Sequence, residues 1–324
     1  MAEGDLKTYR GNCHCGKFIY EIKVPEIKEY NECNCSICRR KGYAFVIPGE
    51  GNFQFVKGSM DELKTYSFGN QYFTHCVSRS SLMLRTKVLD SAAAAAAGVQ
   101  LNSLTFWATF QFCPDCGTAI LGDCPQVTPS IFINARAIQG LDIWSLKSKT
   151  FDGNALAPPY KPPVYDGPEP SMEVENGKVY YGSCHCGAVR LALKVKPFET
   201  WDTLSDEESV VECNCSSCVR GAQVWCYPHK DQSVILGREN ISYHIFNTKT
   251  GRKGFCKHCG VPLFNEENPP KEFAALSDDA KKSRESVGNQ CNINLRILQD
   301  FDYKTLKTLR LDGAGDIPGG YVDP

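Results

Sequence analysis

The sequence lacks the features that identify several common classes of protein. No long apolar run is present: residues 91–114 carry no charge, but their Gln, Asn, Ser and Thr side chains make them too polar for a transmembrane helix. Residues 1–20 contain charged side chains and no apolar segment, so we expect no signal peptide. The 36 Lys and Arg residues balance 37 Asp and Glu residues without a block of like charge. We therefore expect neither a membrane nor a nucleic acid as partner.

Nucleotide-binding motifs and long amphipathic helices are also scarce. Neither GxGxxG nor GxxxxGK[ST] occurs, and no regular alternation of strands and helices is present. Short segments rich in β-branched and aromatic residues, bounded by Gly, Pro or Asn, predict strands instead. They lie at 18–22, 43–47, 189–195, 241–246 and 293–297. The expected fold class is all-β.

Cysteine, in contrast, is abundant, with 18 among 324 residues. Most of these cysteines are two or three positions apart, a spacing that makes them poor disulfide partners for one another. Without a signal peptide, a disulfide framework is disfavoured further. We expect a cytoplasmic protein, with the nucleus not excluded, whose crowded thiolates share metal ions.

Four sequence blocks occur twice in the same order, which indicates a tandem duplication. The blocks are GxCHCG at 11–16 and 182–187, ECNCSxC at 32–38 and 212–218, FCxxCG at 112–117 and 255–260, and INxR followed by DG at 133–153 and 293–313. We predict a first domain at 5–155, a Pro-rich linker at 156–176 and a second domain at 177–316.

In each repeat, the first and last cysteine pairs supply four thiolates, the ligand set of a closed structural zinc site. Buried free thiols or a redox pair are the alternatives. The predicted ligands are Cys13, Cys15, Cys113 and Cys116 in the first repeat and Cys184, Cys186, Cys256 and Cys259 in the second.

The middle block of each repeat supplies three thiolates within six residues, which suits an open zinc site that keeps one position for water or a substrate thiolate. A structural site with an unidentified fourth ligand, or thiols without metal, are the alternatives. The candidate catalytic residues, as ligands of open zinc sites, are Cys33, Cys35, Cys38, Cys213, Cys215 and Cys218.

Two histidines, two arginines and four further cysteines lie near or outside these blocks. His14 and His185 lie between ligands and are expected to point away from the metal, with a ligand or proton-transfer role as the alternative. Arg40 and Arg220 are expected to be solvated, with binding of a substrate carboxylate as the alternative. Four further cysteines are expected to be ordinary core or surface residues: Cys76, Cys124, Cys226 and Cys291.

The order GxCxCG, CxCSxC, FCxxCG and NxR resembles the glutathione-dependent formaldehyde-activating enzyme family, also named for centromere protein V, twice in one chain. The resemblance implies two tandem Mss4-like zinc-binding β domains, each with a structural zinc on the outer four cysteines and a second zinc on the middle three. That makes up to four zinc ions per chain. It also implies a carbon–sulfur lyase that interconverts S-hydroxymethylglutathione with glutathione and formaldehyde, glutathione being the co-substrate.

The chain departs from the family pattern at two places. Asn34 and Asn214 stand where the family usually has His in the middle block, and Val219 replaces the Arg39 of the first repeat. If that His transfers protons, this chain has lost it. The alternative to the lyase is a non-catalytic, zinc-stabilised module that binds glutathione, another small thiol adduct or a protein.

The first repeat contains an insertion between its second and third cysteine blocks. Cys38 and Cys113 are 75 positions apart, whereas Cys218 and Cys256 are 38 apart. Removing residues 77–111 nearly equalises the spacing, and the residues at both ends of this segment can be encoded by splice-site sequences. We hypothesise that 77–111 is a retained intron read as protein, with a genuine surface loop as the alternative.

Overall fold

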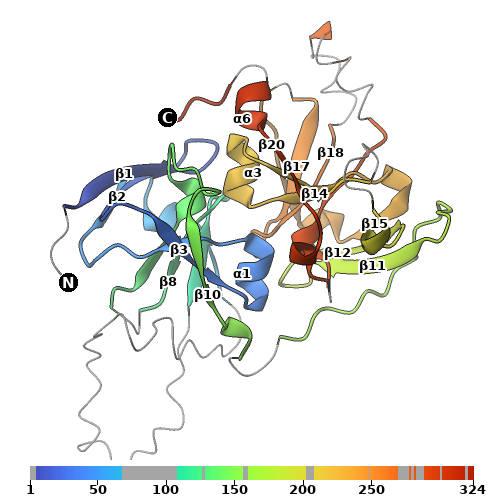
Figure 1. The fold of residues 1–324 in the computed structure, drawn as a ribbon, viewed down its shortest axis with the longest axis horizontal. Helices are drawn as coiled ribbons and strands as arrows, with labels where there is room; N and C mark the ends of the chain where they lie inside the picture. Colours follow the sequence, from blue (N-terminus) through green and yellow to red (C-terminus); the bar gives the residue numbers. More distant parts are fainter. Residues whose placement is uncertain are drawn as a thin grey trace, which may run out of the picture.

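The computed structural model describes residues 5–67, 108–125, 128–155, 160–201, 208–247, 249–268, 277–278, 281, 288–299, 301–317 and 320–324. Within these ranges the protein is mostly β (Figure 1), and its α-helices α1 (Ser36–Lys41), α3 (Ser216–Gly221) and α6 (Gly313–Asp316) have six residues or fewer. The all-β prediction is confirmed, and the small sheets with cysteine clusters are consistent with Mss4-like domains. No described helix has the length and apolar character needed to cross a bilayer. The hypothesised intron, 77–111, lies outside the described residues except for 108–111. Cys76 lies wholly outside them.

The first half, residues 5–155, contains two sheets. The smaller sheet has the order β1 (Lys7–Asn12), β2 (Ile19–Val24), β5 (Phe53–Lys57). The larger sheet has the order β10 (Lys147–Phe151), β3 (Glu29–Cys33), β4 (Phe45–Val46), β9 (Ile131–Asn134), β8 (Ala119–Asp123), β7 (Thr109–Phe112), β6 (Lys64–Tyr66). Short 3-10 turns occur at η1 (Met60–Glu62), η2 (Ala135–Ala137) and η3 (Gly153–Ala155).

The second half, residues 177–317, has the same arrangement of strands. Its smaller sheet has the order β11 (Lys178–Ser183), β12 (Arg190–Val195), β15 (Ser233–Leu236). Its larger sheet has the order β16 (Ile241–His244), β17 (Gly251–Cys256), β18 (Pro262–Glu267), β19 (Asn292–Asn294), β14 (Val224–Cys226), β13 (Val211–Cys213), β20 (Leu309–Leu311). The 3-10 turns are η4 (Phe198–Thr200), η5 (Lys230–Gln232), η6 (Arg238–Asn240), η7 (Leu295–Ile297) and η8 (Tyr303–Thr305). In both large sheets the strand at one edge, β10 or β20, is parallel to its neighbour.

The INxR blocks end a strand and begin a turn. The segment predicted as a strand at 293–297 is a strand only to Asn294, because the Asn294 side chain accepts a hydrogen bond from the backbone N–H of Arg296 and caps η7. Asn134 caps η2 in the same way. Each block thus turns its arginine away from the sheet and toward the other half of the molecule.

The two halves pack against each other and share a buried core. Ile37 and Tyr43 of the first half belong to the same buried cluster as Leu263 and Ile293 of the second. Helix α1 packs on η7, and α3 packs on η2. Figure 1 shows both helices between the two sets of sheets. The middle cysteine block of each half, which leads into its helix, therefore lies near the boundary between the halves.

Candidate metal centres and the pocket between the halves

The structure brings the outer cysteines of each half together. The sulfur atoms of Cys13, Cys15, Cys113 and Cys116 lie within 4.8 Å of one another, as do those of Cys184, Cys186, Cys256 and Cys259. The Sγ atoms of Cys184 and Cys186 are 3.5 Å apart, and those of Cys13 and Cys15 are also 3.5 Å apart. Tetrahedral coordination with Zn–S bonds of about 2.3 Å places sulfurs about 3.8 Å apart, so both clusters fit a metal ion of this size.

Backbone geometry supports these clusters. The N–H of Val189 donates to Cys184 Sγ at 3.2 Å, and the N–H of Phe18 donates to Cys13 Sγ at 3.3 Å. Such bonds stabilise thiolate charge. Gly260, which follows the last cysteine of its cluster, has φ +68° and packs against the ring of Phe112 from the first half, 2.6 Å from where its Cβ would be. Glycine is therefore required there twice, for the backbone angle and for the contact between the halves.

The middle cysteines form two further clusters of three. The sulfurs of Cys33, Cys35 and Cys38 lie within 4.8 Å of one another, as do those of Cys213, Cys215 and Cys218. A Cβ added to Gly153 would overlap Cys33 Sγ, and one added to Gly313 would overlap Cys213 Sγ. The DG blocks recur in the sequence because these glycines leave room for a sulfur atom.

Asn34 and Asn214, the residues between the first two cysteines of each middle block, connect these same blocks. Asn214 Nδ2 donates to Asp312 Oδ1 at 2.7 Å, and Asn214 Oδ1 accepts from the backbone N–H of Ala314 at 2.8 Å. Asn34 makes the equivalent bonds to Asp152 and Asn154. Both side chains thus hold the DG loop against the cysteine cluster.

One thiol in each middle cluster favours its ionised form. Hydrogen bonds from its two cysteine neighbours lower the pKa of Cys33 to about 4. Hydrogen bonds from Cys213 and Cys218 likewise lower the pKa of Cys215, and the charge of Lys253 adds to this effect. The thiolate is the form that binds metal, so the clusters are chemically prepared for a cation.

The two middle clusters differ in their surroundings. Lys253 Nζ lies 3.1 Å from Cys218 Sγ and also donates to Ser217 Oγ at 2.8 Å and Gln223 Oε1 at 2.7 Å. Trp225 Nε1 donates to Cys218 Sγ at 3.3 Å. By sheet register and block alignment, the first half has Phe, Ile or Tyr at the positions of these four residues, and none of the four polar contacts is repeated there among the described residues. The aligned residues are Phe110 for Lys253, Ile37 for Ser217, Tyr43 for Gln223 and Phe45 for Trp225.

The histidines between the outer ligands point across the boundary between the halves. His14 Nε2 lies 3.1 Å from Ser216 Oγ, and its Nδ1 lies 2.8 Å from His244 Nε2. In the mirrored arrangement, His185 Nε2 lies 2.9 Å from Ser36 Oγ. Burial lowers the pKa of both His14 and His185 to about 3, so both rings are neutral near pH 7.

A tyrosine beyond each repeat covers the histidine of the other half. Tyr321 stacks on His14 with ring centroids 4.7 Å apart, and its hydroxyl donates to the His14 carbonyl at 2.8 Å. Tyr160, in the segment predicted as a linker, stacks on His185 at 4.5 Å and donates to the His185 carbonyl at 2.7 Å. The chain after each repeat therefore crosses to the other half, and the C-terminus lies beside the first half (Figure 1).

Arg40 and Arg220 are buried, so the expectation that they are solvated is wrong. They are only 3% and 6% exposed. Arg220 Nη2 forms an ion pair with Asp323 at 2.6 Å and donates to Asn12 Oδ1 at 3.0 Å, and its guanidinium lies 4.9 Å from the Tyr321 ring. Each arginine lies one helical turn after the serine of its CxCS block, and its side chain extends into the other half. There Arg40 Nε donates to the carbonyl of Ser183, as Arg220 donates to Asn12.

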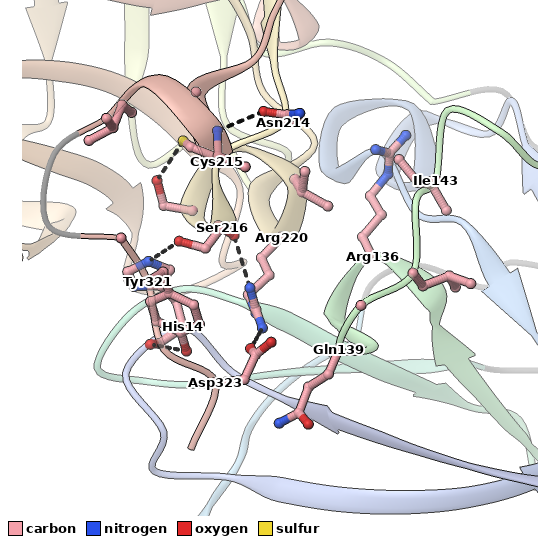
Figure 2. A pocket seen from close by; sticks show the side chains of 18 of the residues that line it. His14, Arg136, Gln139, Ile143, Asn214, Cys215, Ser216, Arg220, Tyr321 and Asp323 are labelled. Atoms are coloured by element: carbon pink, nitrogen blue, oxygen red, sulfur yellow. Dashed lines mark hydrogen bonds and ion pairs between the residues drawn. The ribbon is translucent and has the colours of Figure 1, made fainter.

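A pocket of about 580 Å³ opens beside Cys215, between the halves. The second half contributes α3 and residues 214–217, and the first half contributes Arg136 and the loop 138–144. His14, His244 and the C-terminal segment 320–323 also line it. Figure 2 shows Arg136 and Ile143 on one side, with Cys215, Ser216 and Arg220 on the other. Its volume lies within the range of about 300–1,000 Å³ usual for small-molecule sites.

The corresponding place beside the first-half cluster contains an arginine. Arg39 Nη2 donates to the carbonyls of Leu298 and Phe301, in the loop equivalent to 138–144. In the second half, Val219 occupies the aligned position and lines the pocket. A short side chain thus leaves space at Cys215 that a long one occupies near Cys35.

Three of the four cysteines outside the repeated blocks lie among the described residues. Cys124, Cys226 and Cys291 are buried core residues, as expected. Sequence reasoning missed Lys253, Tyr160 and Tyr321. The spacing of eight residues from Asp152 to Tyr160 and nine from Asp312 to Tyr321 is a signal that was available in the sequence.

Three comparisons relate this chain to known proteins. A family model described as "Glutathione-dependent formaldehyde-activating enzyme" matches residues 179–294. A "Putative glutathione-dependent formaldehyde-activating enzyme" of Halomonas elongata is 36% identical over 53 residues, which are 15% of this chain and 34% of that protein. The chain thus spans about a third of the length of this curated relative. A crystal structure of a Rhodobacter sphaeroides protein has 22% identity and a TM-score of 0.29, covering 40% of this chain and 97% of that one, and this likeness supports no argument.

Proposed function

Because residues 179–294 belong to the glutathione-dependent formaldehyde-activating enzyme family, we propose that the protein is a zinc-dependent carbon–sulfur lyase acting on adducts of glutathione with aldehydes. S-hydroxymethylglutathione is the simplest such adduct. The reaction site is the cluster of Cys213, Cys215 and Cys218. The observation that supports this choice is the pocket beside Cys215, because Arg39 occupies the equivalent place beside the first-half cluster.

Both middle clusters offer three thiolates, which suits zinc with one open position, whereas the outer clusters offer four and suit closed structural sites. A bound zinc ion supplies a positive charge that keeps a thiol ionised near neutral pH. The proposed complement is two zinc ions per half and up to four per chain. Glutathione is then the co-substrate.

The residues of the second half suit cleavage of the adduct. The carbon–sulfur bond breaks, its electron pair stays on sulfur, the hydroxyl oxygen loses its proton to become the carbonyl of formaldehyde, and a proton returns to yield the thiol. Lys253 places a positive charge 3.1 Å from Cys218 Sγ, where it offsets the negative charge gathered on the cluster. Ser217 and Gln223 hold this ammonium in place.

We propose that the first half, residues 5–155, is a second domain of the same family with a non-catalytic role. Its middle cluster is surrounded by Phe110, Tyr43 and Ile37, and Arg39 occupies the space next to it. The proposed connecting segment is 156–176, and the proposed second domain is 177–316. On this view the first half supplies structural zinc and one wall of the pocket.

Cys215→Ser and the matched Cys35→Ser variant test the assignment. The assay follows exchange between labelled formaldehyde and its glutathione adduct by NMR, with the zinc-loaded full chain compared with buffer alone. We expect Cys215→Ser to lose the acceleration and Cys35→Ser to keep it. Wild-type protein that exchanges no faster than buffer would falsify the lyase assignment. Equal loss in both variants would contradict the assignment to the second half.

A further inference from the structure

We propose that the guanidinium of Arg136, which belongs to the first half, binds a carboxylate of the ligand whose sulfur lies at the Cys213, Cys215 and Cys218 cluster of the second half. The inference rests on the proposed function for the identity of that ligand. It assigns a role to the INxR block of the first half, and it makes ligand binding depend on both halves of the chain.

Arg136 is positioned by the turn that its own block forms. The Asn134 side chain caps η2, and η2 packs against α3, the helix that carries Cys218. Arg136 Nε donates to the carbonyl of Gly42 at 2.7 Å, which fixes the side chain within the first half. The guanidinium then lines the same pocket as Cys215 (Figure 2).

The outer nitrogens of Arg136 are available for a ligand. Among the residues that the structure describes, Nη1 and Nη2 of Arg136 have no hydrogen bond or ion pair. Burial, followed by repulsion from Arg296, lowers the pKa of Arg136. A partly buried cation that lies near another cation and lacks an anionic partner is stabilised when an anion binds.

The other arginines near the boundary already have partners. Arg220 binds Asp323 and Asn12. Arg296, which is equivalent to Arg136, donates to the carbonyls of Ala222 and Arg39, and its guanidinium lies 4.7 Å from the Tyr303 ring.

In the first half, Ile143 stands where the second half has Tyr303, and Figure 2 shows it beside Arg136. Without the aromatic ring and the additional carbonyl acceptor, the planar fork of Arg136 remains free for a carboxylate. Two parallel hydrogen bonds to one carboxylate are the contact that a guanidinium makes best.

The chemical class of the ligand follows from these groups. One end must present sulfur to a cysteine-bound metal, and another end must present a carboxylate to Arg136. Glutathione and its adducts carry a thiol or thioether and two carboxylates, so they meet both requirements. The pocket of about 580 Å³ accommodates a tripeptide.

The test compares Arg136→Gln with wild type in the zinc-loaded full chain, using glutathione and its diethyl ester as probes. Isothermal titration calorimetry gives the dissociation constants. We expect Arg136→Gln to bind glutathione about 10- to 100-fold more weakly, because the variant cannot form the charge-assisted bond. Binding of the diethyl ester, in which both carboxyl groups are uncharged ester groups, should change less than about twofold. Arg296→Gln is the matched control and should leave the ratio of the two affinities unchanged.

Three results would overturn the inference: an equal loss for both ligands, no loss for glutathione, or wild-type protein that binds neither. The ratio between the two ligands separates the removal of a carboxylate contact from a general loss of folding. A failure of the proposed function is seen differently. If wild type prefers glutathione to the ester and Arg136→Gln removes that preference, but no exchange is accelerated, then the carboxylate site stands and the lyase assignment falls.

Discussion

Replacing Lys253 with methionine should weaken metal binding at the middle cluster of the second half and leave the four-cysteine clusters unaffected. Lys253 Nζ contacts Cys218 Sγ at 3.1 Å and is held by Ser217 and Gln223 at 2.8 and 2.7 Å. Three thiolates around one divalent cation carry a net charge of −1, which the ammonium neutralises. Methionine preserves much of the side-chain volume and removes only the charge and its hydrogen bonds.

The size of the effect follows from the hydrogen bond between the ammonium and the Cys218 thiolate, which methionine cannot form. A hydrogen bond to a charged group contributes about 1.5–3 kcal/mol. Each 1.4 kcal/mol is a factor of ten in an equilibrium constant, so we expect metal affinity to fall about 10- to 100-fold, the range usual when a partner of a metal ligand is removed. The Trp225 bond to Cys218 at 3.3 Å remains, which keeps the effect from being larger.

The assay is a competition with a chelator, in which alkylation and mass spectrometry of the peptide that contains Cys213, Cys215 and Cys218 show when this cluster loses its metal. Lys257→Met is the matched control, because Lys257 is half-buried like Lys253, and its Nζ donates to the carbonyl of Glu239 rather than to a cysteine. Unchanged protection of the peptide in Lys253→Met would refute the reasoning. The reasoning would also fail if the wild-type first-half cluster, with Phe110 in this position, held its metal as tightly as the second.

Three further predictions follow from the contacts between the halves and from the insertion. Val219→Arg should fill the pocket beside Cys215 and lower kcat/KM for the adduct more than about tenfold without loss of zinc. Arg39→Val, which opens the equivalent place beside the first-half cluster, should leave the rate unchanged. The exchange assay measures the rates, and native mass spectrometry measures the zinc content. Tyr321→Ala removes the stacking on His14 and the contact with Arg220, so the free energy of unfolding should fall by about 1–3 kcal/mol and KM should rise. Tyr160→Ala should also lower the free energy of unfolding but leave KM unchanged. Native mass spectrometry of protein from its own source should show four zinc ions and a mass lacking residues 77–111; a full-length mass would make this segment a genuine loop.

The spacing of the cysteines in the sequence was enough to predict which cysteines lie close to one another. The groups of cysteines expected to share metal ions come together in space. The two- and three-residue spacings keep the cysteines within each block close, and the fold brings the first and last blocks of each half together. Short segments rich in β-branched and aromatic residues were also enough to predict an all-β protein. Strand ends were less accurate, since at Asn294 a side-chain cap ends the strand that β-branched residues would otherwise continue.

The contacts between the halves could not be predicted, because periodicity describes the environment of a residue and not its partner. Arg220 was expected in solvent, since an arginine on a short helix is usually exposed, but its partners Asn12 and Asp323 are 208 and 103 positions away in the chain. His14 likewise meets His244 at a separation of 230 residues. Contacts of this kind depend on how two folded units dock.

Joining the halves in one chain lets two related sites diverge. In a symmetric dimer of single domains, every substitution appears at both sites, so an arginine that fills one pocket fills the other as well. Here Arg39 and Val219 stand at equivalent positions, as do Phe110 and Lys253. The first half can therefore lose space and polarity at its own cluster and still supply Arg136, His14 and a docking surface to the second. Tethering also keeps the halves together at any protein concentration, so we expect activity per chain to be independent of dilution, and a rate that fell on dilution would mean that a second chain completes the site.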